Sequence, residues 1–265
     1  MKVIENTVVK SNTEIASGIW ELVADSPKIC SEYRGPGQFV SILPIDGWQH
    51  PLRRPMSIAA VKKSSLTIIY KIFGDVTSEF SKLQKGDNLN MLGPIGNTFS
   101  GWDDSGYDPV LVGGGVGLAP ILNLKNTCAD NGIAVAVIIG ARRGAEHFMD
   151  HDPDNGLWLT TDDGSLGAAG TVMPTLEDVI ASLPNPRLFA CGPEPMLEAV
   201  RDFSIAKGIP AELSVESYMA CGIELCQGCV IAKPNGQDKK NSYHERYSLV
   251  CADGPIYEAK DISFG

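Results

Sequence analysis

The stretch ACGIELCQGC at residues 220–229, followed by LVCADGP at residues 249–255, decides how the C-terminal part of this chain folds. Together the two segments contain four cysteines: Cys221, Cys226, Cys229 and Cys251. The pattern C-x4-C-x2-C, with a fourth cysteine on a separate segment, is typical of a plant-type [2Fe–2S] cluster. Gly222 and Gly228 would let the loop wrap closely round the sulfur atoms. We therefore expect these four thiolates to bind two irons.

A structural zinc site is the alternative, because Cys226 and Cys229 also form half of a zinc ribbon. A ribbon normally has a second pair of cysteine or histidine ligands. Here only Cys251 lies downstream, and Cys221 would have no role. The spacing therefore favours the iron–sulfur cluster. A disulfide framework is not expected in a chain of 265 residues with seven cysteines and no export signal.

Length and charge limit the possible functions. The 265 residues are enough for two domains and a small appendage. A net charge of −10 argues against binding to nucleic acid or to an anionic membrane surface, because phosphates would be repelled. The longest apolar stretch, residues 133–141, is far shorter than the roughly 20 residues that span a membrane. We expect a cytoplasmic protein without a membrane segment.

The pattern of apolar residues changes near residue 105. Before it, short runs of alternating or β-branched residues separated by Gly and Pro predict a closed or nearly closed antiparallel β-barrel. After it, strands alternate with helices, which predicts a parallel sheet with helices on both faces. The expected fold is thus α/β plus all-β, with a barrel domain at 1–105, a nucleotide-binding domain at 106–215 and a cluster-binding domain at 216–265.

Two motifs in the barrel region predict the walls of a flavin dinucleotide site. In RRPMS, Arg54 would hold a pyrophosphate while the extended backbone of residues 55–57 faces the edge of a flat ring. In YKIFGDVTSEF, Tyr70 offers an aromatic surface, and Thr77 with the amides of the following helix would bind phosphate. Each motif alone also fits a surface arginine pair or an ordinary strand-to-helix turn. Their succession along the chain favours one shared site.

A glycine-rich motif, GGGVGLAP, lies between an expected strand and an expected helix. Its glycines would let the backbone approach a pyrophosphate: Gly113, Gly114, Gly115 and Gly117. It is not the Rossmann pattern, because Pro120 occupies the last position. Arg142 and Arg143, after the second strand, would favour the 2′-phosphate of NADP. Asp162 and Asp163, after the third strand, would favour the free ribose of NAD.

The motif CGPEPM places Cys191 at the end of a strand, with Gly192 and Pro193 in the loop that follows. Such a loop can face a nicotinamide ring. The alternative is that Cys191 is a small buried residue, since free cysteines are often buried. We assign Cys30 and Cys128 to packing.

Taken in order, RRPMS, GDVT, GGGVGLAP, CGPEPM and the cysteine segments resemble the ferredoxin-reductase superfamily, and most closely the electron-transfer subunits of NAD-dependent dihydroorotate dehydrogenases. The resemblance covers essentially the whole chain. It implies FAD in the barrel domain, NAD at the nucleotide domain and a [2Fe–2S] cluster. The residues it implies for FAD are Arg54, Pro55, Met56, Ser57, Ile69, Tyr70, Lys71, Val76 and Thr77. Val76 stands where the family usually has glycine.

The same resemblance implies a role in pyrimidine biosynthesis and a partner, an FMN-containing catalytic subunit that oxidises dihydroorotate, in a heterotetramer. A catalytic barrel needs about 250 residues, so that oxidation must occur on another chain. A cluster passes single electrons and NAD+ accepts a hydride, so a flavin must stand between them. The expected order is partner flavin, cluster, FAD, NAD+. Alternatives are a subunit of a sulfide dehydrogenase or a ferredoxin:NADP oxidoreductase, and a zinc-stabilised nucleotide-binding module without enzymatic activity.

Overall fold

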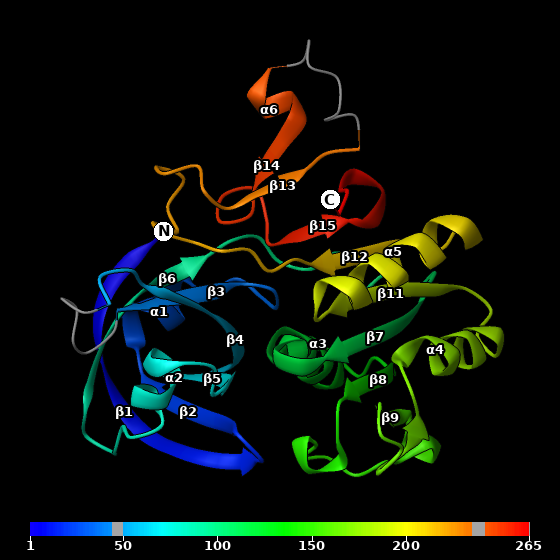
Figure 1. Cartoon of the computed structure of the whole chain (residues 1–265), viewed down its shortest axis with the longest axis horizontal. Coiled ribbons are helices and arrows are strands. Elements are labelled where there is room, and N and C mark those ends of the chain that lie inside the picture. The colour runs from blue at the N-terminus through cyan, green and yellow to red at the C-terminus, as the bar shows by residue number, and fades with distance from the viewer. Residues whose placement is uncertain (44–49, 235–241, 265) are drawn as a thin grey trace.

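The computed structural model describes residues 1–43, 50–234 and 242–264. Its N-terminal part is a closed antiparallel barrel in the strand order β1-β2-β5-β4-β3-β6 (Figure 1). The predicted barrel is thereby confirmed. Its strands are β1 (Val3–Ala16), β2 (Ile19–Asp25), β3 (Phe39–Leu43), β4 (Arg54–Lys62), β5 (Ser65–Lys71) and β6 (Asn88–Ile95), with the short helices α1 (Pro27–Glu32) and α2 (Asp75–Phe80).

The second part is a seven-stranded sheet in the order β10-β9-β8-β7-β11-β12-β15. Because side chains alternate along a strand, Val110 and Val112 of β7 pack toward α4 and α5, whereas Leu111 packs toward α3. Both faces are therefore buried, as the continuous apolar run predicts. The elements are β7 (Asp108–Gly114), α3 (Leu118–Asp130), β8 (Ala136–Ala141), β9 (Leu157–Thr161), β10 (Ala168–Ala169), α4 (Val172–Ala181), β11 (Pro186–Cys191), α5 (Glu194–Lys207) and β12 (Ala211–Ser214).

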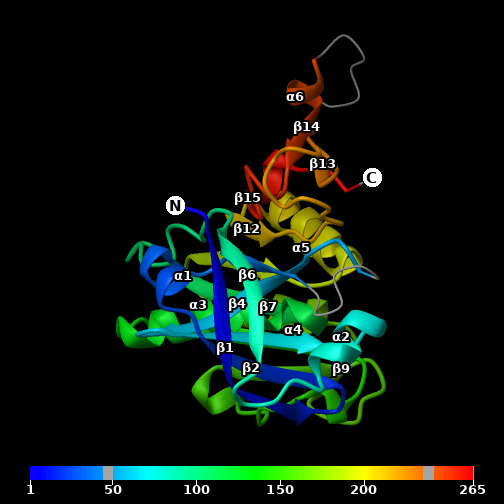
Figure 2. The same ribbon diagram turned by 90° about the vertical axis from the view of Figure 1, so that its left-hand side faces the viewer.

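The C-terminal part lies above the other two in Figure 1 and projects from them in Figure 2. It contains β13 (Val230–Ala232), α6 (Tyr243–Arg246), β14 (Tyr247–Leu249) and β15 (Ile256–Glu258). The sequence does not predict that β15 joins the nucleotide-domain sheet, where it pairs antiparallel with β12. This strand covers an edge that would otherwise expose unpaired backbone groups. No helix within the described ranges is long and apolar enough to cross a membrane.

Asn97 connects the end of the barrel to the C-terminal part. Its Nδ2 donates to the carbonyl oxygens of Asp253, at 3.0 Å, and of Ile256, at 2.8 Å. Its Oδ1 accepts from the amide of Ile256 at 2.8 Å. The segment that carries Cys251 is therefore held against the barrel by side-chain hydrogen bonds.

Replacing Asn97 with alanine should remove these three hydrogen bonds and leave backbone groups without partners. We expect the thermal unfolding midpoint of the cofactor-loaded chain to fall by about 2–6 °C. Asn155→Ala is the matched control, because the Asn155 side chain makes one exposed hydrogen bond, to the Asp152 carboxylate. A midpoint for Asn97→Ala no lower than that of the control would contradict the tethering role.

Candidate functional site

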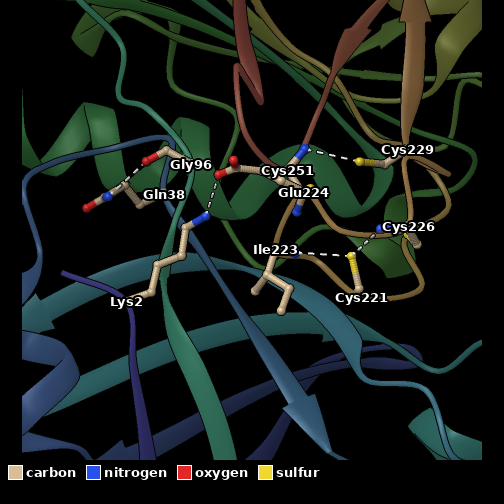
Figure 3. Close-up of polar contacts among 9 residues, drawn as sticks. All are labelled: Lys2, Gln38, Gly96, Cys221, Ile223, Glu224, Cys226, Cys229 and Cys251. Carbon is tan, nitrogen blue, oxygen red and sulfur yellow. Dashed lines mark hydrogen bonds and ion pairs between the residues drawn. The ribbon is translucent and has the colours of Figure 1, made fainter.

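The cysteine loop lies on the C-terminal part, and Figure 3 shows the four cysteine side chains gathered there. Backbone amides point at the sulfur atoms: Ile223 N and Cys226 N donate to Cys221 Sγ at 3.4 and 3.3 Å, and Glu224 N donates to Cys251 Sγ at 3.3 Å. The wrapping needs positive φ at Gly222 (+67°), as expected, and also at Glu224 (+74°) and Gln227 (+54°). Gly228 does not have a positive φ, but its amide approaches Cys226 closely.

The four thiols are arranged in two pairs. Cys221 and Cys226 are hydrogen-bonded to each other, and so are Cys229 and Cys251, where Cys251 N donates to Cys229 Sγ at 3.4 Å. A [2Fe–2S] cluster needs four cysteine ligands divided between two irons, whereas zinc needs four donors round one ion. The paired arrangement therefore fits the cluster. Within the described residues, no three His, Cys, Asp or Glu side chains form a group that could hold one metal ion.

The two pairs differ in exposure. Cys229 and Cys251 are 2% and 1% exposed, whereas Cys226 lies at the surface. Burial raises the pKa of Cys251 to about 12, and backbone amide donors, with that of Cys221 contributing most, lower the pKa of Cys226 to about 7. The loop thus has an inner pair in the core and an outer pair facing solvent.

A cavity of about 210 Å³, here called the barrel cavity, lies between the barrel and the chain that leaves β12. Six residues predicted to contact FAD line it: Pro55, Met56, Ser57, Ile69, Tyr70 and Lys71. Tyr70 is held by a hydrogen bond from its hydroxyl to Asn12 Oδ1, and burial raises its pKa to about 12. The cavity and its walls fit a flat aromatic group.

Three other predicted residues do not line this cavity. Arg54 Nη1 donates to the carbonyl of Leu52 at 2.7 Å. The Thr77 hydroxyl accepts from Phe73 N at 2.6 Å and donates to the carbonyl of Gly74, so it holds its own loop in place. Val76 is 6% exposed and packs in the core of the barrel. Their contacts to FAD stay predictions.

A second cavity of about 550 Å³, here called the sheet cavity, opens at the carboxyl ends of the parallel strands. Three of the residues predicted to contact NAD line it: Gly114, Gly115 and Pro193. Thr160 also lines it and is fully buried, and its hydroxyl has no hydrogen-bond partner. Such a group needs a ligand or water to satisfy it. The site fits a polar ligand in the position where open α/β sheets bind nucleotides.

The glycine-rich loop lies very close to the end of β11. A Cβ added at Gly117 would lie 2.3 Å from the carbonyl oxygen of Cys191, and one added at Gly114 would lie 2.7 Å from Met196 Sδ. Gly113 is paired in register with Cys191, which is paired with Ser214. The predicted residues of both motifs therefore meet at one edge of the sheet.

Cys191 itself is 1% exposed and lines neither the barrel cavity nor the sheet cavity. Burial raises its pKa, so the thiol is neutral. Its neighbours Gly192 and Pro193 line a third cavity of about 610 Å³, the C-terminal cavity, beside β13. The nicotinamide-facing role of Cys191 stays a prediction.

Sequence reasoning missed the wall that closes the barrel cavity on the side of the nucleotide domain. This wall is the chain between β12 and the cysteine loop, and its lining residues are Ser214, Val215, Glu216, Ser217 and Met219. Glu216 also lines the C-terminal cavity, and burial raises its pKa. The one feature of the sequence that could have indicated this wall is its position, because the segment leads directly from the last parallel strand to Cys221.

The barrel, the nucleotide-type sheet and the paired thiols define a flavin- and iron–sulfur-dependent oxidoreductase for electron transfer. Comparison with known proteins agrees. Residues 216–263 match the family model described as the iron–sulfur cluster binding domain of dihydroorotate dehydrogenase B. The chain is 33% identical to the dihydroorotate dehydrogenase B (NAD(+)) electron transfer subunit of Fusobacterium nucleatum, covering 98% of each chain. It is 34% identical to that of Bacillus caldolyticus, covering 97% of this chain and 98% of the relative.

The chain therefore belongs to the family of dihydroorotate dehydrogenase B (NAD(+)) electron transfer subunits. Family, fold class and electron-transfer function are as predicted, and so is the cofactor set of FAD, a [2Fe–2S] cluster and NAD. Among solved structures, an NADH-dependent reduced ferredoxin-NADP oxidoreductase superposes with a TM-score of 0.81 at 24% identity, covering 98% of this chain and 90% of that chain. A Neisseria gonorrhoeae ferredoxin NADP+ reductase gives 0.63 at 17% identity, covering 77% and 92%. These two show the fold.

Replacing Gly117 with alanine should push the glycine-rich loop away from the backbone of Cys191, because the new Cβ would overlap it. We expect the affinity for NAD+, measured by calorimetry, to fall by at least about tenfold. Gly106→Ala is the comparison, because Gly106 does not line the sheet cavity and its Cβ would meet only the Asp104 carboxylate, at 3.2 Å. Equal losses of affinity in the two variants would show that the close approach is unimportant.

Proposed function

We propose that this chain carries electrons from an FMN-containing dihydroorotate dehydrogenase catalytic subunit to NAD+. The observation that carries the proposal is the short covalent path between two sites. Met219 lines the barrel cavity and lies two residues before Cys221, and Pro255 lines the same cavity four residues after Cys251. The first cysteine segment therefore starts at the wall of the barrel cavity, and the second ends there. A cluster held there lies beside a flavin.

Each part of the chain has one task in this scheme. Residues 1–105 bind FAD, residues 106–215 bind NAD, and residues 216–265 bind the cluster. The cluster ligands are Cys221, Cys226, Cys229 and Cys251. The FAD contacts are Arg54, Pro55, Met56, Ser57, Ile69, Tyr70, Lys71, Val76 and Thr77, and the NAD contacts are Gly113, Gly114, Gly115, Gly117, Cys191, Gly192 and Pro193.

When bound, the cluster passes single electrons, the flavin takes them singly or in pairs, and NAD+ accepts a hydride. The protein orients the cofactors and adjusts their reduction potentials. Backbone amides directed at Cys221 and Cys251 stabilise negative charge on sulfur. The apolar side chains of Ile69 and Met56 would shield a flavin bound in the barrel cavity from water.

The sheet cavity is lined by Arg142 and Asp162, but not by Arg143 or Asp163. Asp163 is instead engaged with Ser165, whose amide and hydroxyl donate to its carboxylate. A carboxylate in the cavity accepts hydrogen bonds from a ribose and repels a 2′-phosphate. Asp162 therefore favours NAD over NADP.

The catalytic subunit docks beside the outer cysteine pair in our proposal, and two copies of each subunit form a heterotetramer. Large apolar side chains surround the cysteine loop at the surface: Tyr218 is 98% exposed, Leu225 82% and Ile223 42%. Such apolar surface is typical of a protein–protein interface. Docking here brings the partner's flavin to the exposed side of the cluster.

Changing Cys226 to serine should remove one cluster ligand and so abolish dihydroorotate-dependent NAD+ reduction by the reconstituted complex. NADH oxidation with an artificial flavin-level acceptor should persist, because it needs only the flavin. Both activities are followed by rapid-reaction absorbance measurements, and iron and sulfide assays show whether the cluster is present. Cys30→Ser, outside the loop, is the control. Equal loss of both activities would count against a relay through the cluster.

Asp162→Ser should reduce the preference for NAD+ over NADP+ by at least about tenfold, because it removes a charge that repels the 2′-phosphate. Affinities of both dinucleotides by calorimetry measure the ratio. Asp163→Ser removes the same charge outside the cavity and should leave the ratio nearly unchanged. The assignment is wrong if both variants change the ratio equally.

A further inference from the structure

An ion pair in the wall of the sheet cavity joins the barrel to the nucleotide domain. Lys71, the last residue of β5, places its Nζ 2.9 Å from Oε2 of Glu146, which ends the 3-10 helix η2 (Gly144–Glu146). Close by along the chain, the amide of Ser17 donates to the carbonyl of Ala145 at 2.9 Å. The pair therefore lies on the seam between the two domains.

Both partners belong to the walls of the site as well as to the seam. Lys71 and Glu146 line the sheet cavity, and Lys71 also lines the barrel cavity. Lys71 is thus the residue that the two cavities share. Lys71 is therefore within reach of ligands in either cavity.

The charges in the sheet cavity make the pair a competitor for an anionic ligand. Two cations, Lys71 and Arg142, and two anions, Glu146 and Asp162, line it. The chain as a whole carries a net charge of −10, so a dinucleotide diphosphate depends on local cations for attraction. In the structure one of those cations is already neutralised by Glu146.

The pair is also weak enough to exchange. The side chains are 32% and 17% exposed, and partly solvated pairs of this kind contribute little net stability. Lysine is a mobile point charge on a flexible stem, so it can change partners without movement of the backbone.

We propose that Glu146 is an internal competing anion: it holds Lys71 at the domain seam until NAD binds, and Lys71 then exchanges Glu146 for the anionic dinucleotide. Lys71 is thereby a positioning residue for the dinucleotide. This inference rests on the proposed function, because it takes the sheet cavity as the NAD site. If the ion pair were instead a permanent brace between the domains, loss of the Glu146 carboxylate would weaken the binding of NAD+ rather than strengthen it.

The test is calorimetric titration of NAD+ into the cofactor-loaded chain. Glu146→Gln should bind NAD+ about two- to fivefold more tightly than the wild type, because Lys71 is freed. Lys71→Met should bind it more weakly. In the double variant the gain from Glu146→Gln should disappear, because there is no Lys71 to release. Asp25→Asn, which removes one negative charge from a barrel ion pair with Lys10 outside the cavities, should bind as the wild type does.

The remaining outcomes overturn the proposal in distinguishable ways. Unchanged or weaker binding by Glu146→Gln would show that Glu146 is a brace or irrelevant. Tighter binding that persists in the Lys71→Met background, or that Asp25→Asn reproduces, would show a general charge effect. The flavin absorbance of each variant shows whether it has bound its flavin. If Lys71→Met loses the flavin, the direction of the change in NAD+ affinity of Glu146→Gln alone decides. A wild-type chain that binds no NAD+ would overturn the proposed function itself.

Discussion

The structure depends on a covalent constraint: the cysteine-bearing segments are anchored where they leave the barrel cavity. Two residues span at most about 7 Å, so Cys221 cannot move far from Met219 in the cavity wall. The second segment is anchored by a hydrogen bond as well, because Val215 N donates to the carbonyl of Pro255 at 2.9 Å. The pairing of β15 with β12 extends this anchor into the nucleotide-domain sheet. One small region thus fixes the positions of all three parts.

The two cysteine pairs differ in exposure, so the cluster site has a buried side and a side that faces solvent. Cys229 and Cys251 lie in the core together with residues of the nucleotide-domain sheet, and Cys226 faces solvent. Burial and hydrogen bonds to sulfur are the main means by which a protein adjusts a cluster potential. A centre with one side in the core and the other at the surface can meet an external partner without exposing the flavin. Each pair is tied to the wall of the barrel cavity, Cys221 through Met219 and Cys251 through Pro255.

Much of the fold and of the candidate site could be predicted from the sequence, because it follows from local patterns of residues. The cysteine spacing, the alternation of barrel strands and the glycine-rich loop each follow from neighbouring residues. The rest depends on contacts between distant segments. Thr77 shows the limit: the sequence does not predict that its hydroxyl also bonds to Phe73 N and to the carbonyl of Gly74, which hold its own loop in place. β15 and the residues from Ser214 to Glu216 gave no local signal, because their role comes from what they pack against.

The register of the parallel sheet explains why motifs far apart in the sequence meet. Gly114 is paired with Gly140, which is paired with Thr160, and Gly113 is paired with Cys191 in the other direction. In a parallel sheet these positions lie at the same edge, and the absence of side chains at the glycines leaves room there. A Cβ at Gly140 would lie 2.7 Å from Val172 Cγ1, so α4 also depends on this glycine to approach the sheet. Small residues at the carboxyl ends of the strands therefore allow close packing and leave room for a ligand. Cys191 is small and buried, so it suits this position whether or not a nicotinamide ring lies against Gly192 and Pro193.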